Sequence, residues 1–226
     1  MTVASEGNAQ PLLYGYWRSS SSYRVRIALN LKGIAYRQQA VHLVQDGGQQ
    51  NLPAYRAVNP LGLVPALVHG DRAIVQSVAI CEYLEEVFPQ PPLLPPDASG
   101  RARVRAIVQT IASEIQPLNN LAVLRHLERD MGQPDAAVRR WYAHWIERGF
   151  AALETWLGET AGGDFCHGDR PTLADCFLVP QVYNAERFDC DLSPWPGIAQ
   201  IAAHCRSLAA FRAAEPERQP DAAAAQ

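Results

Sequence analysis

Several features that would assign a protein to a large class at once are missing from this chain of 226 residues. No apolar run approaches the roughly 20 residues of a membrane-spanning helix, and the opening segment MTVASEGNAQ lacks the basic start and apolar core of a secretory signal. Neither sign of charge dominates, because the net charge is only −3. We therefore expect neither a membrane nor a nucleic acid among the partners.

Cysteine usage and the common catalytic motifs give further exclusions. The five cysteines are an odd number and include no C-x-x-C pair, which favours reduced thiols in a cytoplasmic protein over a disulfide framework or a zinc site. No G-x-S-x-G, P-loop, G-x-G-x-x-G or H-E-x-x-H motif occurs, and the six histidines do not cluster at the spacing of metal ligands. The sequence therefore predicts no metal site and no nucleotide cofactor.

The first part of the chain alternates strand and helix signals. Hydrophobic spacing predicts a strand, a helix and a strand, then a short helical piece, a hairpin and a helix, at 11–17, 20–32, 36–43, 52–58, 64–75 and 77–88. This order, βαβ followed by ββα, predicts a compact α/β domain over residues 11–89.

A proline-dense segment, residues 90–97, cannot continue a helix and is interpreted as a linker. Strand signals fade after it, so we expect an all-helical domain over 98–226. Its helices are predicted at 101–131, 135–158 and 172–186, with shorter pieces at 196–214. Thr172 and Asp175 form a capping box at the start of one helix, and the tail from Glu215 is expected to fray.

Four consecutive serines, Ser19 to Ser22, fall where the first predicted strand is followed by the first helix. At such a junction the first backbone N–H groups of the helix lack partners, and the helix dipole favours negative charge. One serine here needs no explanation beyond capping. Four of them beside Arg18 favour a site that binds and activates an anion, with capping and a polar turn as the alternative.

Two further connections could contact a ligand. In the segment 59–65, a cis Val64–Pro65 bond would leave the Val64 N–H and C=O to pair with an extended ligand. X-Pro bonds are cis in only about 5% of cases, however, and an ordinary turn is the alternative. Gln76 and Ser77 open the last helix of the α/β domain, where they could hold a carboxylate. Simple capping would explain Ser77 but not Gln76.

These three features, in this order, resemble the glutathione transferase family, and most closely its zeta class, whose members include maleylacetoacetate isomerases. The zeta signature S-S-C-x-W-R-V-R-I-A-L is matched by S-S-S-S-Y-R-V-R-I-A-L over 19–29. Other zeta-like stretches lie at 46–50, 59–65, 76–77, 115–121, 179–188 and 218–221. The resemblance covers about residues 11–221. It implies a thioredoxin-like N-terminal domain, an all-helical C-terminal domain and a homodimer.

The resemblance also implies roles in binding glutathione. Ser19 and Ser20 would be the catalytic residues next to the glutathione sulfur, with Ser21 beside them. Val64, before the family's cis-proline, would pair with the cysteinyl backbone of glutathione. The remaining residues of the implied site are Gln76 and Ser77 at the γ-glutamyl end, Gln50 at the glycyl side, and Gln116, Asn120 and Leu121 from the helical domain.

The expected reaction is glutathione-dependent cis–trans isomerisation of maleylacetoacetate in aromatic amino-acid catabolism. Glutathione would add to the cis double bond as a thiolate and leave after rotation. Because the maleyl substrate is dianionic, Arg18 and Arg187 are predicted to clamp its carboxylates, with surface or interdomain salt bridges as the alternative. Arg24 and Arg26 are interpreted as structural or dimer-interface residues.

One departure from the signature leaves the substrate open. Ser21 stands where the zeta class usually has cysteine, and relatives that act on maleylpyruvate commonly lack that thiol. The alternatives are therefore a maleylpyruvate isomerase, or a general zeta-class transferase that conjugates electrophiles or dehalogenates α-halo acids. The retained serines count against a glutathione-binding protein without catalysis. The lack of cysteine at 19–23 counts against a thiol-disulfide oxidoreductase.

Overall fold

A computed structural model describes residues 10–159 and 163–222 of the chain. These residues belong to two compact units, one built from the chain up to Leu93 together with the segment from Leu208 onward, and the other from Leu94–Ser207. The C-terminal segment therefore packs with the first unit, although the sequence placed it in the helical domain.

The first unit contains a four-stranded mixed sheet with the order β2-β1-β3-β4. Its strands are β1 (Leu12–Gly15), β2 (Arg37–Ala40), β3 (Ala66–His69) and β4 (Arg72–Val75). β1 runs parallel to β2 and antiparallel to β3, and β3 forms an antiparallel hairpin with β4. This pattern confirms the predicted thioredoxin-like βαβ-ββα order.

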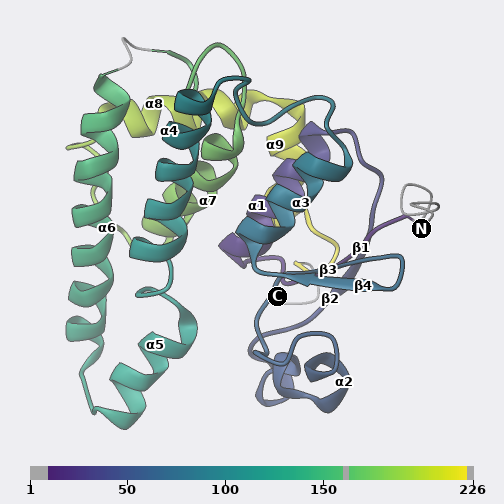
Figure 1. Cartoon of the computed structure of the whole chain (residues 1–226). Helices are drawn as coiled ribbons and strands as arrows, with labels where there is room; N and C mark the ends of the chain where they lie inside the picture. The colour runs from purple at the N-terminus through teal and green to yellow at the C-terminus, as the bar shows by residue number, and fades with distance from the viewer. Residues whose placement is uncertain (1–9, 160–162, 223–226) are drawn as a thin grey trace. The chain divides into compact units, whose positions relative to one another are not determined.

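Helices cover both faces of this sheet. In Figure 1, α1 and α3 lie on one side of the sheet and the short α2 lies beyond the other side. The helical elements of the first unit are α1 (Ser20–Leu31), η2 (Gln45–Gly47), η3 (Gln49–Asn51), α2 (Pro53–Arg56), α3 (Ser77–Val87), α9 (Ala209–Ala214) and η6 (Pro216–Arg218). The three short η segments are 3₁₀ helices.

Helix α1 is buried on nearly all sides, which explains how two arginines only two positions apart are both enclosed. Arg24 and Arg26 are each 1% exposed. Arg26 Nε donates to the Ala214 carbonyl at 3.0 Å, while Arg24 Nη1 donates to Ser77 Oγ at 3.3 Å. The C-terminal segment thus covers one side of α1 and α3 covers the other. Burial within a single chain favours the structural interpretation of both arginines.

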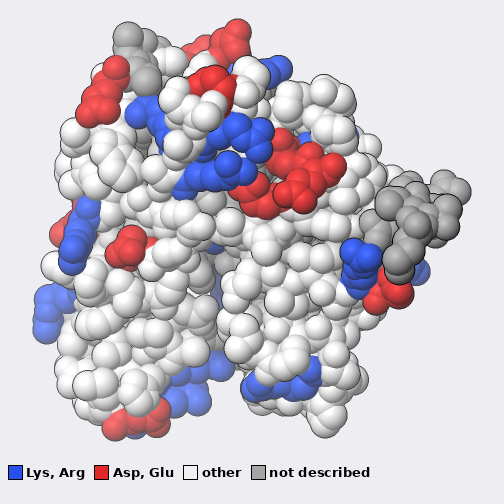
Figure 2. Space-filling view, in the orientation of Figure 1, with Lys and Arg blue, Asp and Glu red and all other residues white. Residues whose placement is uncertain are grey.

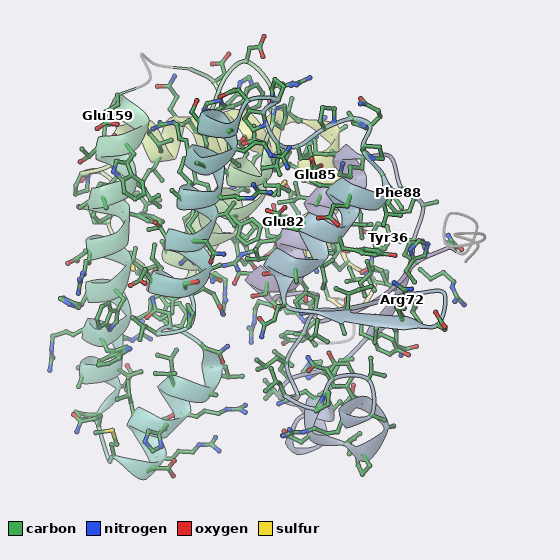
Figure 3. The ribbon with its side chains drawn as sticks, in the orientation of Figure 1. Tyr36, Arg72, Glu82, Glu85, Phe88 and Glu159 are labelled. Atoms are coloured by element: carbon green, nitrogen blue, oxygen red, sulfur yellow. The ribbon has the colours of Figure 1, made fainter. Side chains whose placement is uncertain are left out.

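A buried ion pair fixes the end of the first unit. Lys32 Nζ lies 2.5 Å from Glu85 Oε1, and it donates to the carbonyls of Phe88 and Pro91 at 2.8 and 3.0 Å. The same Glu85 oxygen accepts the Leu93 N–H at 2.9 Å. Figure 3 labels Glu85 on α3 and Phe88 just beyond it. The proline-rich segment therefore leaves α3 in a fixed conformation.

The second unit is helical, as predicted. Its elements are α4 (Ala98–Gln109), η4 (Thr110–Ile115), α5 (Leu121–Arg125), η5 (His126–Asp130), α6 (Asp135–Gly158), α7 (Leu173–Arg187) and α8 (Pro196–Ser207). The prediction of a single helix over 101–131 is wrong, because the helix ends before Pro117 and a new one is capped by Asn120. Gly149 allows close packing here, since a Cβ at this position would lie 2.2 Å from Ile115 Cδ1.

Helix α7 supplies much of the core of the second unit, with eleven buried residues. The predicted capping box is confirmed: the Thr172 N–H and hydroxyl donate to the Asp175 carboxylate at 2.7 and 2.9 Å. The same carboxylate accepts the Cys166 N–H at 2.8 Å. This motif therefore has the structural role predicted for it.

The tail does not fray within the described residues. Gln219 is buried, and its Nε2 donates to the carbonyls of Ala213 and Glu215 at 3.0 and 2.7 Å. The expectation of a frayed tail is wrong up to Ala222, and residues 223–226 lie outside the described part.

Two surface properties bear on possible partners. In the face drawn in Figure 2, basic and acidic side chains are both present in small groups, some of them adjacent, and most of the surface is uncharged. None of the helices over 10–159 and 163–222 combines the length and the apolar character required to cross a bilayer.

Candidate active site

The register of the sheet brings the three predicted ligand-binding connections to one edge. Tyr14, near the end of β1, pairs with Ala66 at the start of β3, and Ala66 pairs with Val75 at the end of β4. The serine turn follows β1, the Val64–Pro65 bond immediately precedes β3, and Gln76 immediately follows β4. Segments far apart in the sequence therefore converge at one site.

Ser19 is the N-cap of α1. Its backbone is extended, and its Oγ accepts the Ser22 N–H at 3.3 Å. A hydroxyl that accepts one hydrogen bond can still donate its own proton. Capping and ligand binding are therefore compatible at Ser19, rather than alternatives.

The other serines of the run differ in their surroundings. Ser20 is buried at the first position of α1, and Ser21 is half-buried. Ser22 is fully buried, its Oγ accepts the Tyr16 N–H at 3.4 Å, and it packs against Gly15, where a Cβ would lie 3.2 Å from that oxygen. Ser22 therefore stabilises the turn, and the earlier three serines remain as candidates for the ligand.

The Val64–Pro65 peptide bond is cis, as the resemblance implied and the local sequence did not. The Leu63 carbonyl just before it accepts hydrogen bonds from Tyr55 Oη at 2.6 Å and Asn59 Nδ2 at 2.7 Å. Burial raises the pKa of Tyr55 to about 12, so this phenol stays protonated and remains a donor. The sheet pairing with β1 begins at Ala66, so Val64 lies just outside it.

Gln76 has a backbone conformation that side chains seldom adopt. Its φ is 72°, in the left-handed region, and it is the N-cap of α3 without a capping hydrogen bond from its side chain. Such backbone strain is concentrated at functional sites. Simple capping does not describe Ser77 either, since it is the first residue of the helix and its hydroxyl accepts from Arg24.

Arg24 supplies a buried positive charge behind the start of α3. Burial lowers the pKa of its guanidinium to about 10, with the neighbouring Cys81 thiol acting in the opposite direction. The group therefore stays protonated near neutral pH. Its charge adds to the positive end of the helix dipole at the place where a carboxylate is predicted to bind. The sequence did not identify Arg24 as part of this site.

Gln50 and His42 bring further polar atoms to the first unit. Gln50 Nε2 donates to the Leu43 carbonyl at 3.5 Å, while its Oε1 is buried without a partner among the described residues. His42 Nδ1 accepts the Val44 and Gln45 N–H groups, so the ring proton sits on Nε2, which is also buried without a described partner. The sequence did not predict His42 as a candidate ligand-binding residue, because nothing in its sequence context distinguishes it from the other histidines.

The predicted site residues of the helical unit lie around the interruption after η4. Gln116 is half-buried directly after this π-helical segment. Asn120 caps α5, its Oδ1 accepting the Ala122 N–H at 3.0 Å, and Leu121 is 37% exposed. Their roles in binding glutathione stay predictions.

The two predicted clamp arginines belong to different units. Arg18 stands beside Trp17, with its guanidinium carbon 5.3 Å from the indole centroid. Arg187 ends α7 and lies 5.8 Å from the Tyr183 ring and 5.7 Å from the Phe188 ring. Flat aromatic faces support a guanidinium and leave its edge for a carboxylate. Their use as a clamp also stays a prediction.

The first unit suits a short peptide with anionic ends. The end of the sheet offers the Val64 backbone, which lies just outside the β1–β3 pairing, and the N-termini of two helices. The same unit holds two buried polar atoms without a partner among the described residues, Gln50 Oε1 and His42 Nε2. Backbone pairing fits the middle of a peptide, and a helix N-terminus fits a carboxylate or a thiolate.

Comparison with known proteins identifies the relatives of this chain. The model for the glutathione S-transferase N-terminal domain matches residues 13–92, and the model for the corresponding C-terminal domain matches residues 137–206.

Individual relatives match over nearly the whole chain. A probable maleylacetoacetate isomerase of Vibrio cholerae is 50% identical over 93% of this chain and 98% of its own length. A bacterial maleyl pyruvate isomerase of the zeta class is 48% identical, with a TM-score of 0.90 over 93% of this chain and 99% of the other. A maleylacetoacetate isomerase of Anaeromyxobacter dehalogenans, solved with dicarboxyethyl glutathione and citrate in its active site, is 47% identical, with a TM-score of 0.84 over 95% and 94%.

Proposed function

This chain belongs to the glutathione S-transferase family, and we propose that it is a glutathione-dependent isomerase that converts maleylacetoacetate to fumarylacetoacetate. The observation that carries the proposal is the convergence of the serine turn, Val64 and Gln76 at one edge of the sheet. Relatives named for this reaction at 47–50% identity support it, as does the bound glutathione derivative in one of them.

Glutathione fits the polar groups of the first unit. We propose that Val64 pairs with its cysteinyl backbone, that Gln76 and Ser77 hold its γ-glutamyl end above the buried charge of Arg24, and that Gln50 binds its glycyl side. From the helical unit, the proposed contacts are Gln116, Asn120 and Leu121. When bound, glutathione supplies a thiolate that adds to the cis double bond of a maleyl acid and leaves after rotation, without net redox change.

The serines are proposed to hold the sulfur as a thiolate. A free thiol has a pKa of about 8.5, so only a few per cent is ionised at neutral pH. Lowering that value by about two units requires roughly 2.7 kcal/mol of preferential stabilisation of the thiolate. The Ser19 hydroxyl, whose proton is not used in capping, and the N-terminus of α1 can contribute this much together. Ser20 and Ser21 are the further candidates for donating a hydrogen bond to the thiolate.

Arg18 and Arg187 are proposed to bind the two carboxylates of the substrate. Each guanidinium is supported by an aromatic ring, which orients its donors at little entropic cost. Fixed cations would also favour the charge that builds up on the substrate during addition.

Ser21 favours a second candidate, maleylpyruvate isomerase. A serine replaces the thiol usual in the zeta class, and a maleyl pyruvate isomerase is among the structures that resemble this chain. A general zeta-class transferase or α-halo acid dehalogenase would use the same thiolate on saturated carbon.

The test is to mix the protein with glutathione and follow the absorbance of maleylacetoacetate and of maleylpyruvate in separate reactions. The proposal expects glutathione-dependent loss of both, with the higher kcat/KM for maleylacetoacetate. A higher value for maleylpyruvate would select the second candidate. If neither acid is consumed faster than without protein, while an α-halo acid is dechlorinated, the transferase alternative is correct.

We further propose a cytoplasmic homodimer. All five cysteines are free, which suits a reducing compartment, and a native disulfide detected by mass spectrometry would contradict this location.

Four large apolar side chains of the first unit are 39–59% exposed and suit the subunit interface of the proposed dimer: Val44, Leu52, Leu61 and Leu63. Light scattering would contradict the dimer if it gave the 24.9 kDa of one chain rather than twice that mass.

A further inference from the structure

We propose that the C-terminal segment, which begins at Leu208, positions the turn proposed above to bind glutathione, through a hydrogen bond from the Trp17 N–H to the Asp221 carboxylate at 2.9 Å. The inference rests on the proposed function, because the next two residues of that turn are Arg18 and Ser19. Asp221 would act as a positioning residue, since it contacts the turn and not the reacting atoms.

Both polar groups of the Trp17 backbone are held from outside the turn. Its N–H donates to Asp221, and its C=O accepts Arg26 Nη2 at 2.9 Å. Within the turn, the Ser19 N–H donates to the Tyr16 carbonyl at 3.0 Å. The two peptide groups that flank Trp17 are therefore each held by one hydrogen bond, and the directions of the Arg18 and Ser19 side chains depend on them.

The C-terminal segment is itself anchored to the first unit, so it can act as a rigid support. Arg26 joins the two elements directly, because the guanidinium that holds the Trp17 carbonyl also donates from Nε to the Ala214 carbonyl at 3.0 Å. Further along, Gln38 Nε2 donates to Gln219 Oε1 at 3.1 Å. Figure 1 shows the yellow C-terminal chain running from α9 past α1 to the sheet.

The chemistry of Asp221 separates positioning from a direct effect of charge. A carboxylate near a thiolate opposes its ionisation, so a purely electrostatic role predicts that Asp221→Asn lowers the pKa of bound glutathione. A positioning role predicts little change in Asp221→Asn, because the amide oxygen can still accept the Trp17 N–H. Asp221→Ala leaves that half-buried N–H without its acceptor, and a displacement of about 1 Å at a catalytic group can reduce the rate about a hundredfold.

The experiment compares the wild type with Asp221→Asn and Asp221→Ala. The ultraviolet absorbance of bound glutathione thiolate is titrated against pH, and kcat is measured with maleylacetoacetate. We expect Asp221→Ala to raise the thiol pKa by about one unit and to lower kcat about tenfold. Asp221→Asn should stay close to the wild type in both. Asp71→Ala, an exposed carboxylate lost from the β3–β4 turn of the same unit, is the matched control and should change neither.

The proposal is overturned if Asp221→Ala lowers the melting temperature but leaves the thiol pKa and kcat unchanged. If Asp221→Ala does not fold, Gln219→Ala loosens the anchor without touching Trp17, and an unchanged thiol pKa in that variant would also overturn it. A wild type that binds glutathione only as the thiol would instead contradict the proposed function. In that case amide hydrogen exchange still tests whether Asp221 holds the turn, because Asp221→Ala must accelerate exchange at the Trp17 and Ser19 N–H groups.

Discussion

At the scale of the residue, the Ser19 hydroxyl serves two functions that can be separated. Its oxygen accepts the Ser22 N–H in the cap of α1, and its proton is proposed to stabilise the thiolate. We predict that Ser19→Ala costs about 1 kcal/mol of stability through the lost cap. It should also lower kcat roughly a hundredfold at saturating glutathione, as the loss of a donor to a developing anion does. Urea unfolding and isomerase assays measure the two effects.

A second cap in the chain provides the control. Asp97 caps α4, its Oδ1 accepting the Gly100 N–H at 2.7 Å, so Asp97→Ala should cost a similar stability with unchanged kcat. The assignment of the sulfur-binding role to the serines is wrong if Ser19→Ala and Ser20→Ala both retain wild-type turnover.

Single residues could be assigned from the sequence where a short local motif indicates their structural role. A serine run at a helix start and a Thr-x-x-Asp box are local signals, and both serve the helix ends predicted from them. The sequence did not indicate Arg24 and His42 as candidates for the site, because their interest depends on burial and, for Arg24, on a partner distant in the sequence. Arg24 meets Ser77, 53 positions away. The cis bond before Pro65 came from the family resemblance alone.

At the scale of the element, the Lys32–Glu85 pair is the clearest target. It joins the end of α1 to α3 and to the proline-rich segment, and the two side chains are 0% and 8% exposed. Lys32→Met leaves the Glu85 carboxylate buried and unpaired, so we predict a loss of about 3–5 kcal/mol in the free energy of unfolding. Lys32→Met combined with Glu85→Leu should recover only part of that loss, because the Phe88 and Pro91 carbonyls and the Leu93 N–H then lack their partners. Urea unfolding followed by circular dichroism measures both.

An exposed ion pair of the helical unit shows what to expect without burial. Arg139 Nε lies 2.8 Å from Asp135 Oδ2, with side chains 57% and 81% exposed, and Arg139→Ala should change stability by less than about 0.5 kcal/mol. If the Lys32 and Arg139 variants lose equal stability, burial is not what gives the Lys32 pair its importance.

The positions of helices and strands were predicted well where hydrophobic spacing within the element defines them. Features that depend on contacts between distant parts of the sequence were not predicted. The β3–β4 hairpin and α6 follow from local hydrophobic spacing and appear close to their predicted positions. The break at Pro117 was overlooked, since apolar spacing continues on both sides of it. The return of the C-terminal segment to α1 had no local signal either, because Arg26 contacts Ala214 across 188 positions.

At the scale of the whole molecule, the reactivity of the five free thiols measures how well the core of each unit is protected from solvent. Cys81 lies in the first unit and the other four in the second, and only Cys190 is more than slightly exposed. Burial raises the pKa of Cys81 to about 12, and it raises the pKa of Cys166 and Cys205 well above the ordinary range of a thiol. Thiols that are buried and protonated do not react with disulfide reagents.

We therefore predict that an aromatic disulfide reagent at about pH 8 labels one thiol per native chain, Cys190, while the remaining four react only as the chain unfolds. Cys190 itself should react slowly, because partial burial raises its pKa and the neighbouring Glu147 and Asp189 carboxylates raise it further. The absorbance of the released thiolate counts the labelled groups with and without denaturant. Cys190→Ser should abolish native labelling and leave four groups to appear on unfolding. Native labelling that persists in this variant would show that one unit opens without global unfolding, and mass spectrometry of the labelled peptide would identify which unit it is.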